Sequence, residues 1–77
     1  MTRLPPCRPR VVVRALLRAG FSVHHTTGSH FILRHPAHPR TRVTVPMHNR
    51  DLKRGTLASI LRQAGLSRED FVELLSR

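Results

Sequence analysis

Apolar residues recur at helical spacing near the start of the chain, alternate in its middle, and return to helical spacing towards its end. This order constrains the fold more than any other feature, because a period of about 3.6 residues indicates a helix and a period of about two indicates a strand. From Arg10 to Ala19 the pattern predicts a helix with an apolar face opposite a row of arginines. Pro9 fits the first turn of this helix, because N–H groups there have no acceptor within the helix and proline has none to lose. Gly20 is expected to end the helix.

The middle of the chain begins with one alternating segment and a short break. Residues 21–26 alternate as a half-buried strand does, and this alternation places Val23 and His25 on one face and His24 on the other. Gly28-Ser29 then interrupts the pattern, as a turn between two strands would. A hairpin is therefore expected around this dipeptide.

The second strand is expected to begin at His30, and a third to cover residues 40–45 after a turn over residues 36–39. Links of hairpin length make the sheet antiparallel, so that the polar faces of the strands coincide. The resulting polar surface is expected to gather His24, His30, Arg34, Arg40 and Arg42.

Helical spacing returns over residues 57–64, and Gly65 is expected to end that helix. Ser67 then opens a short last helix with Glu69 and Asp70 in its first turn, an arrangement similar to a capping box. The phenylalanines fall on the buried stripes of these elements, so we expect them to lie in the core: Phe21, Phe31 and Phe71.

These elements define the expected fold class. Their order is α-β-β-β-α-α, which predicts an α+β protein: a three-stranded antiparallel sheet with helices on one face. A chain of 77 residues forms a single domain with one marginal core, burying about 60% of its unfolded surface. We expect that domain to span residues 9–77, preceded by a Pro/Arg-rich lead over residues 1–8.

The charge of the chain is strongly uneven. Residues 1–50 hold nine arginines and no carboxylate, whereas residues 51–77 hold five basic and four acidic residues. Such asymmetry is typical of a surface that faces a polyanion or an acidic partner. RNA is a polyanion that carries its own nucleophile, the 2′-hydroxyl, so one imidazole able to move a proton near neutral pH could cleave it. His30, with hydroxyls and cations for neighbours, is the candidate.

Composition also argues against several other classes of protein. Four carboxylates confined to the last third, and histidine pairs without acidic companions, do not form a metal site, so no metal or other cofactor is expected. Cys7 is the single cysteine, which excludes an intramolecular disulfide. No apolar stretch approaches the roughly 20 residues that span a bilayer, and no signal-peptide pattern is evident. We therefore expect a cytoplasmic protein that does not enter a membrane.

Five short motifs stand in order along the chain: Ala19-Gly20-Phe21, Gly28-Ser29-His30, Val43-Thr44-Val45-Pro46 with His48, Lys53-Arg54-Gly55-Thr56-Leu57, and Ile60-Leu61-Arg62-Gln63-Ala64-Gly65-Leu66-Ser67. Together they resemble the HicA family of toxin ribonucleases, over roughly residues 9–75. Each motif alone is weak, but five in the same order are specific. The Pro/Arg-rich start and the scarcity of lysine depart from the family pattern.

The resemblance implies a fold like the double-stranded-RNA-binding domain and metal-free endonucleolytic cleavage of mRNA. It also implies neutralisation by an acidic HicB-type antitoxin. The family's catalytic histidine follows Gly-Ser at the start of the second strand, and the matching residue is His30. Ser29, His24 and His48 are weaker candidates for assisting it with the leaving group or the phosphate. We expect RNA contacts from Ser29, Arg34, Arg40, Arg42, Lys53 and Arg54, and we expect the antitoxin to cover the exposed sheet face.

A non-catalytic nucleic-acid-binding module is the alternative. Residues 60–75 could form a helix-turn-helix that binds DNA, although Glu69, Asp70 and Glu73 would then face phosphates. A binder of double-stranded RNA is a second form of this alternative. Either binder would leave RNA intact, so a cleavage assay distinguishes these two hypotheses from the hypothesis of a ribonuclease.

Overall fold

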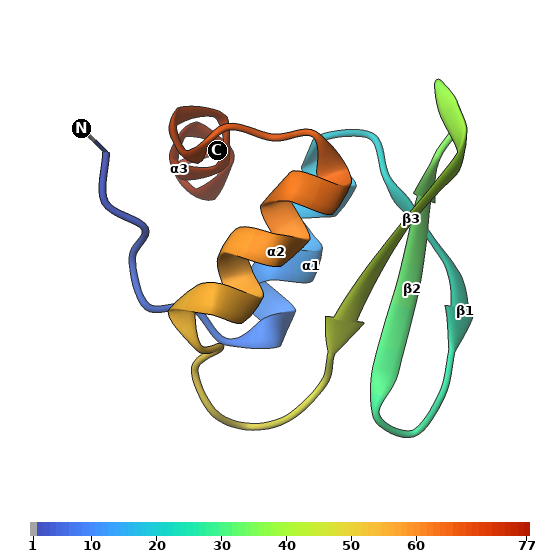
Figure 1. Ribbon diagram of the computed structural model, residues 1–77, viewed down its shortest axis with the longest axis horizontal. Coiled ribbons are helices and arrows are strands. Elements are labelled where there is room, and N and C mark those ends of the chain that lie inside the picture. Colours follow the sequence, from blue (N-terminus) through green and yellow to red (C-terminus); the bar gives the residue numbers. More distant parts are fainter. Residues whose placement is uncertain (1) are drawn as a thin grey trace.

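The structure, a computed structural model, describes residues 2–77 and contains a small sheet with helices packed beside it (Figure 1). The order of elements is the expected one, and the α+β class with a three-stranded antiparallel sheet is confirmed, similar to a double-stranded-RNA-binding domain. The elements are α1 (Pro9–Arg18), β1 (Ser22–Thr26), β2 (His30–His35), β3 (His38–Pro46), α2 (Arg54–Ala64) and α3 (Arg68–Leu75).

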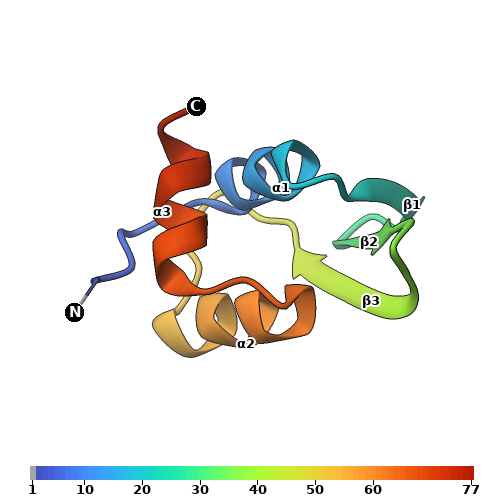
Figure 2. The same ribbon diagram turned by 90° about the horizontal axis from the view of Figure 1, so that it is seen from above.

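The sheet has the order β1-β2-β3, and the helices lie on the side of β3, away from β1 (Figures 1 and 2). In the register, Leu33 pairs with Val43 and Phe31 pairs with Val45, so these residues share the helix-facing side. The buried core joins this side to the three helices, and its largest fully buried side chains are Phe71, Leu16, Leu33, Ile60, Val12, Val43, Val45 and Pro9. Each large side chain buried there contributes about 1.5–3 kcal/mol.

The helix ends agree with the residues expected to form them. Pro9 occupies the first turn of α1, and Gly20 follows this helix with a φ of 98°. Gly65 ends α2 in the left-handed conformation, at a φ of 70°. A capping box begins α3: the Asp70 N–H donates to Ser67 Oγ over 3.0 Å, and the Ser67 N–H donates to the Asp70 carboxylate over 3.3 Å.

One arginine of α1 binds the last helix instead of joining the row of free arginines that the sequence suggests. The guanidinium of Arg18 donates to the backbone carbonyl of Leu74 over 2.8 Å. A cation at the C-terminal end of a helix binds carbonyls that have no partner within the helix, and it opposes the negative end of the helix dipole. The contact therefore fastens α3 to α1.

The first strand forms where it is expected, but the expectation that it is half-buried is wrong. All five residues of β1 are exposed, because β1 forms the edge of the sheet that the helices do not cover (Figure 1). A bulge between Val23 and His25 also shifts the register, so that His25 pairs with Ile32 instead of sharing the face of Val23. An extra residue in one strand moves every later side chain to the other face.

The hairpin between β2 and β3 is tighter than expected. Its turn comprises only Pro36 and Ala37, and His38 already belongs to β3. Further along, Leu33 pairs with Val43 while His35 pairs with His38. Residues 39–42 of β3 therefore stand opposite Arg34, the single residue between Leu33 and His35 on β2. This irregular stretch carries two of the arginines expected to bind RNA.

The N-terminal residues pack against the domain. Cys7 is buried, and its backbone carbonyl accepts a hydrogen bond of 2.8 Å from the Leu52 N–H. Burial raises the pKa of the Cys7 thiol, and the nearby Asp51 carboxylate raises it further. The thiol therefore stays protonated at neutral pH and is no nucleophile.

Among the described residues, the longest helix has 11 residues, and none is long and apolar enough to cross a membrane.

Replacing Gly20 by alanine should destabilise the fold by at least about 1–2 kcal/mol. Alanine would have to adopt the φ of 98°, and its Cβ would lie 2.7 Å from Nε2 of His35. Gly55→Ala is the matched control, because a Cβ there meets nothing within 4 Å and the residue lies in α2. Urea denaturation should find the control neutral or stabilised by up to about 1 kcal/mol. Equal losses in the two variants would contradict this account of Gly20.

Candidate active site

The turn between β1 and β2 presents His30 to solvent and is held by one threonine side chain. Oγ1 of Thr27 accepts the backbone N–H groups of Ser29, over 3.2 Å, and of His30, over 2.9 Å. In the same turn, the Thr27 N–H donates to the His30 carbonyl over 2.9 Å. A side-chain oxygen that accepts backbone N–H groups in this way replaces a backbone turn. Thr27 therefore determines where the strand bearing His30 begins.

A second contact fixes the turn from the other side. The N–H of Met47, just beyond β3, donates to the carbonyl of Ser29 over 2.8 Å. His30 itself pairs with Pro46 at the end of β3. The turn is thus bound to the third strand as well as to its own residues, which gives an exposed loop a rigid base.

The imidazole of His30 is hydrogen-bonded through one nitrogen and free at the other. Its Nδ1 lies 2.9 Å from Oγ of Ser29, and both side chains are exposed. A serine hydroxyl both donates and accepts. When Nδ1–H donates to Oγ, Nε2 offers a lone pair to a proton; when Oγ–H donates to Nδ1, Nε2 carries a proton that it can give. The pair therefore suits both general base and general acid chemistry at Nε2.

Sequence reasoning missed Thr27, although a signal was present. A hydroxyl residue directly before a Gly-Ser turn is well placed to accept N–H groups two and three residues later. Ser29 was expected to contact RNA, and its observed contact is with His30.

The end of β3 brings two further candidates near the turn. His48 and Lys53 line a shallow hollow together with Pro46, which is the strand partner of His30. Nδ1 of His48 accepts the backbone N–H of Arg50 over 3.1 Å, so Nε2 is the nitrogen that remains free. His48 is therefore better placed than His24 to assist at this end of the sheet.

The remaining sheet candidates lie farther along the strands. Arg34 is on the same side of β2 as His30, four residues or about 13 Å away. It is half-buried, and its Nε makes no hydrogen bond. His24 lines a hollow beside Arg34, at the opposite end of β2 from His30. The exposed Arg42 lies on the open face, and the exposed Arg40 lies in the irregular stretch of β3.

Lys53 and Arg54 do not act at one place. Lys53 occupies the N-cap position of α2, without a side-chain cap hydrogen bond, and lines the hollow next to Pro46. Arg54 instead lines a hollow with Arg3 and Arg68, formed with the N-terminal residues. The structure therefore separates two residues that sequence reasoning treated as a pair.

His35 has a structural role, joining the end of α1 to the sheet. Its Nδ1 accepts the Ala37 N–H over 3.0 Å, which leaves the proton on Nε2 to donate to the Ala19 carbonyl over 3.1 Å. The ring also contacts Phe21 edge to face, with ring centroids 5.0 Å apart. Both nitrogens are engaged, so His35 clamps the end of α1 to the sheet.

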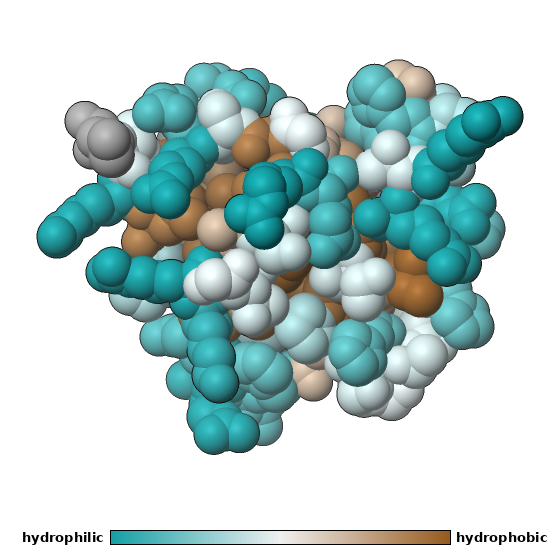
Figure 3. Space-filling model, in the orientation of Figure 1, coloured by the Kyte–Doolittle hydropathy of each residue, from teal (hydrophilic) through white to brown (hydrophobic). Residues whose placement is uncertain are grey.

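Cations around the turn form no ion pair within residues 2–77, although Asp51 lines the hollow that holds His48 and Lys53. The only ion pair within residues 2–77 is Glu73–Arg77, at the end of α3. Hydrophilic side chains project over much of the surface, with apolar residues visible between them (Figure 3). Among residues 2–77, no three His, Cys, Asp or Glu side chains lie close enough together to hold a metal ion.

The fold is that of a small α+β domain of the double-stranded-RNA-binding type, with an exposed histidine on a rigid turn and a carboxylate-poor, arginine-rich surface. A comparison with protein families adds a match over residues 9–66 to the HicA toxin of bacterial toxin–antitoxin systems. The chain belongs to this family, as its motifs indicated, and is therefore a toxin component of such a system. No curated protein matches the chain.

The role of Thr27 can be measured by amide hydrogen exchange. Thr27→Val keeps the shape of the side chain and removes the acceptor, so the N–H groups of Ser29 and His30 lose their partner. A lost hydrogen bond of about 1 kcal/mol corresponds to roughly fivefold faster exchange of both amides. Thr27→Ser restores the acceptor and should exchange like the wild type. Unchanged exchange in Thr27→Val would contradict the assignment, with the Leu66 amide, bonded to Leu61, as the internal control.

Proposed function

We propose that this chain is an endoribonuclease that cleaves mRNA without a metal ion, with His30 as the general acid/base. The observation that carries the proposal is the exposed imidazole bound to Ser29 through Nδ1, with Nε2 open to solvent. A toxin component of a toxin–antitoxin system must damage some cellular target. An arginine-rich surface favours a polyanion as that target.

The proposed reaction transfers the scissile phosphate to the neighbouring 2′-hydroxyl. Nε2 of His30 takes the proton of that hydroxyl as its oxygen forms a bond to phosphorus, and the bond from phosphorus to the 5′-oxygen breaks. The departing 5′-oxygen takes a proton from the imidazolium so formed, directly or relayed through a water molecule, so no charge or atom is left over. The Ser29 hydroxyl oxygen accepts the hydrogen bond from Nδ1–H before and after this transfer, because the imidazolium is protonated at both nitrogens.

The proposed RNA-binding residues lie at three places. Ser29 and Lys53 lie at the end of the sheet that carries His30 and would contact the nucleotide being cut. Arg34, Arg40 and Arg42 lie farther along the strands and would bind phosphates several nucleotides away. Arg54 would add a contact from the start of α2.

The proposal includes an antitoxin as partner and the cytoplasm as the place of action. An mRNA-cleaving toxin has to be held inactive, and an acidic HicB-type antitoxin would be attracted by the positive field of residues 1–50. We propose cytoplasmic action, where mRNA is available, by a domain spanning residues 9–77 with residues 1–8 as its lead.

His30→Ala should lower the rate of RNA cleavage by 10²–10⁴-fold, the usual contribution of general acid–base catalysis. The matched control is His25→Ala, which removes an equally exposed imidazole from the neighbouring strand. Purified variants are compared on the same RNA, with folding checked by circular dichroism. Full activity in His30→Ala would overturn the assignment. An intact RNA bound by the wild type would instead establish a non-catalytic nucleic-acid-binding module.

Cleavage should persist in excess EDTA, because the mechanism uses an imidazole and the 2′-hydroxyl. The measurement is the rate of cleavage with EDTA and with added Mg²⁺ or Zn²⁺. Loss of activity in the chelator and its rescue by either metal would contradict the metal-free mechanism.

A further inference from the structure

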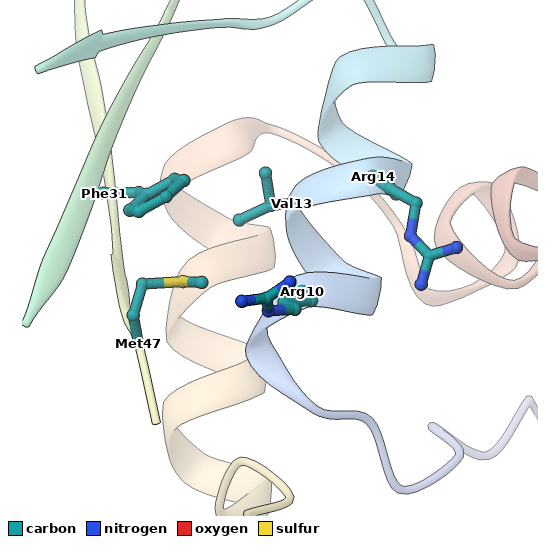
Figure 4. A pocket seen from close by; sticks show the side chains of 5 residues that line it. All are labelled: Arg10, Val13, Arg14, Phe31 and Met47. Carbon is teal, nitrogen blue, oxygen red and sulfur yellow. The ribbon is translucent and has the colours of Figure 1, made fainter. Parts of the chain in front are cut away.

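A groove lies between α1 and the sheet, on the side of the sheet opposite the polar face. Val13, Phe31 and Met47 line it, and Arg10 and Arg14 border it along α1 (Figure 4). Phe31 pairs with the fully buried Val45 but is itself only half-buried. The expectation that Phe31 lies in the closed core is therefore only partly correct, because the helices leave the end of β2 uncovered.

Apolar surface extends beyond the groove. Leu17 is 45% exposed and Val23 is 39% exposed, and they are the only large hydrophobic side chains of residues 2–77 that are exposed. Leu17 lies one helical turn after Val13, and Val23 pairs with Leu33 on the helix-facing side of the sheet. Both therefore continue the lining of the groove towards β1. Contiguous apolar surface with a polar border is typical of an interaction site.

The border of the groove is positive and has no ion-pair partner among residues 2–77. Arg10 and Arg14 stand one turn apart on α1, and no carboxylate occurs in residues 1–50. Neither arginine takes part in an ion pair. The surface thus combines an apolar floor with two guanidinium groups, which is complementary to apolar side chains flanked by carboxylates.

We propose that this groove, defined by Arg10, Val13, Arg14, Phe31 and Met47 and extended by Leu17 and Val23, docks an acidic amphipathic segment of the antitoxin. The inference rests on the proposed function in naming an antitoxin as occupant. Apolar side chains of that segment fill the floor, and its carboxylates pair with Arg10 and Arg14. The floor offers no hydrogen-bonding side chain to a base edge, so the lining favours a peptide over RNA.

The groove is continuous with the turn that carries His30. Phe31 follows His30 directly, and the backbone N–H of Met47 donates to the Ser29 carbonyl. A segment anchored in the groove therefore reaches the backbone of this turn from the face opposite the His30 side chain. This position differs from the sequence-based expectation that the antitoxin covers the open sheet face, and it assigns that face, with Arg34 and Arg42, mainly to RNA.

The experiment measures the affinity of the chain for its cognate antitoxin, the acidic protein proposed above, without RNA present. Leu17→Ser and Arg14→Glu should each weaken binding by about tenfold or more, as loss of a well-packed apolar or arginine contact does. Arg62→Glu, an equally exposed arginine on α2 outside the groove, is the control and should change binding less than about twofold. Leu17→Ser should cleave RNA at the wild-type rate, whereas the pair Arg34→Glu and Arg42→Glu should weaken cleavage more than antitoxin binding.

The outcomes separate the docking proposal from the ribonuclease proposal. Unchanged binding by Leu17→Ser and Arg14→Glu would overturn the groove as the docking site, whatever the RNA assay shows. Impaired cleavage by Leu17→Ser with normal binding would identify the groove as an RNA subsite and also overturn docking. A wild-type chain that binds the acidic protein through the groove but leaves RNA intact would refute only the ribonuclease. Failure of the wild type to bind that protein would refute the docking proposal.

Discussion

The arrangement of this protein depends on packing between its helices and the β2–β3 side of its sheet. Leu33, Val43 and Val45 from the strands meet Leu16 and Ile60 from the helices, and all five are buried. A chain of this length cannot cover a whole sheet, because its buried surface is limited. One edge strand, one sheet face and the turn of His30 are therefore left exposed on a rigid support, as functional loops commonly are.

Helix boundaries could be predicted because local signals decide them. Proline at a helix start, glycine with a positive φ at a helix end, and the Ser67–Asp70 capping box act within a few residues. The position of His30 at the start of β2 was predictable for the same reason, since Gly28-Ser29 marks the turn directly before it.

The details of the sheet could not be predicted, because they depend on pairing between strands. The bulge after Val23 turns His25 to the other face, and the four residues 39–42 of β3 stand opposite one residue of β2. Alternation in one strand contains no information about such insertions. The groove was not predicted because it lies between α1 and the sheet and depends on how they pack. The role of Thr27 was not predicted because its two hydrogen bonds exist only once the turn forms.

In the proposed mechanism this toxin uses the RNA's own 2′-hydroxyl as nucleophile, with His30 moving the proton. The most direct measurement maps the cut site in a defined RNA and then repeats the assay with a single 2′-deoxynucleotide on the 5′ side of that bond. The account predicts that cleavage at this bond is abolished while other sites are cut at the original rate. Cleavage at the substituted position at the original rate would contradict it.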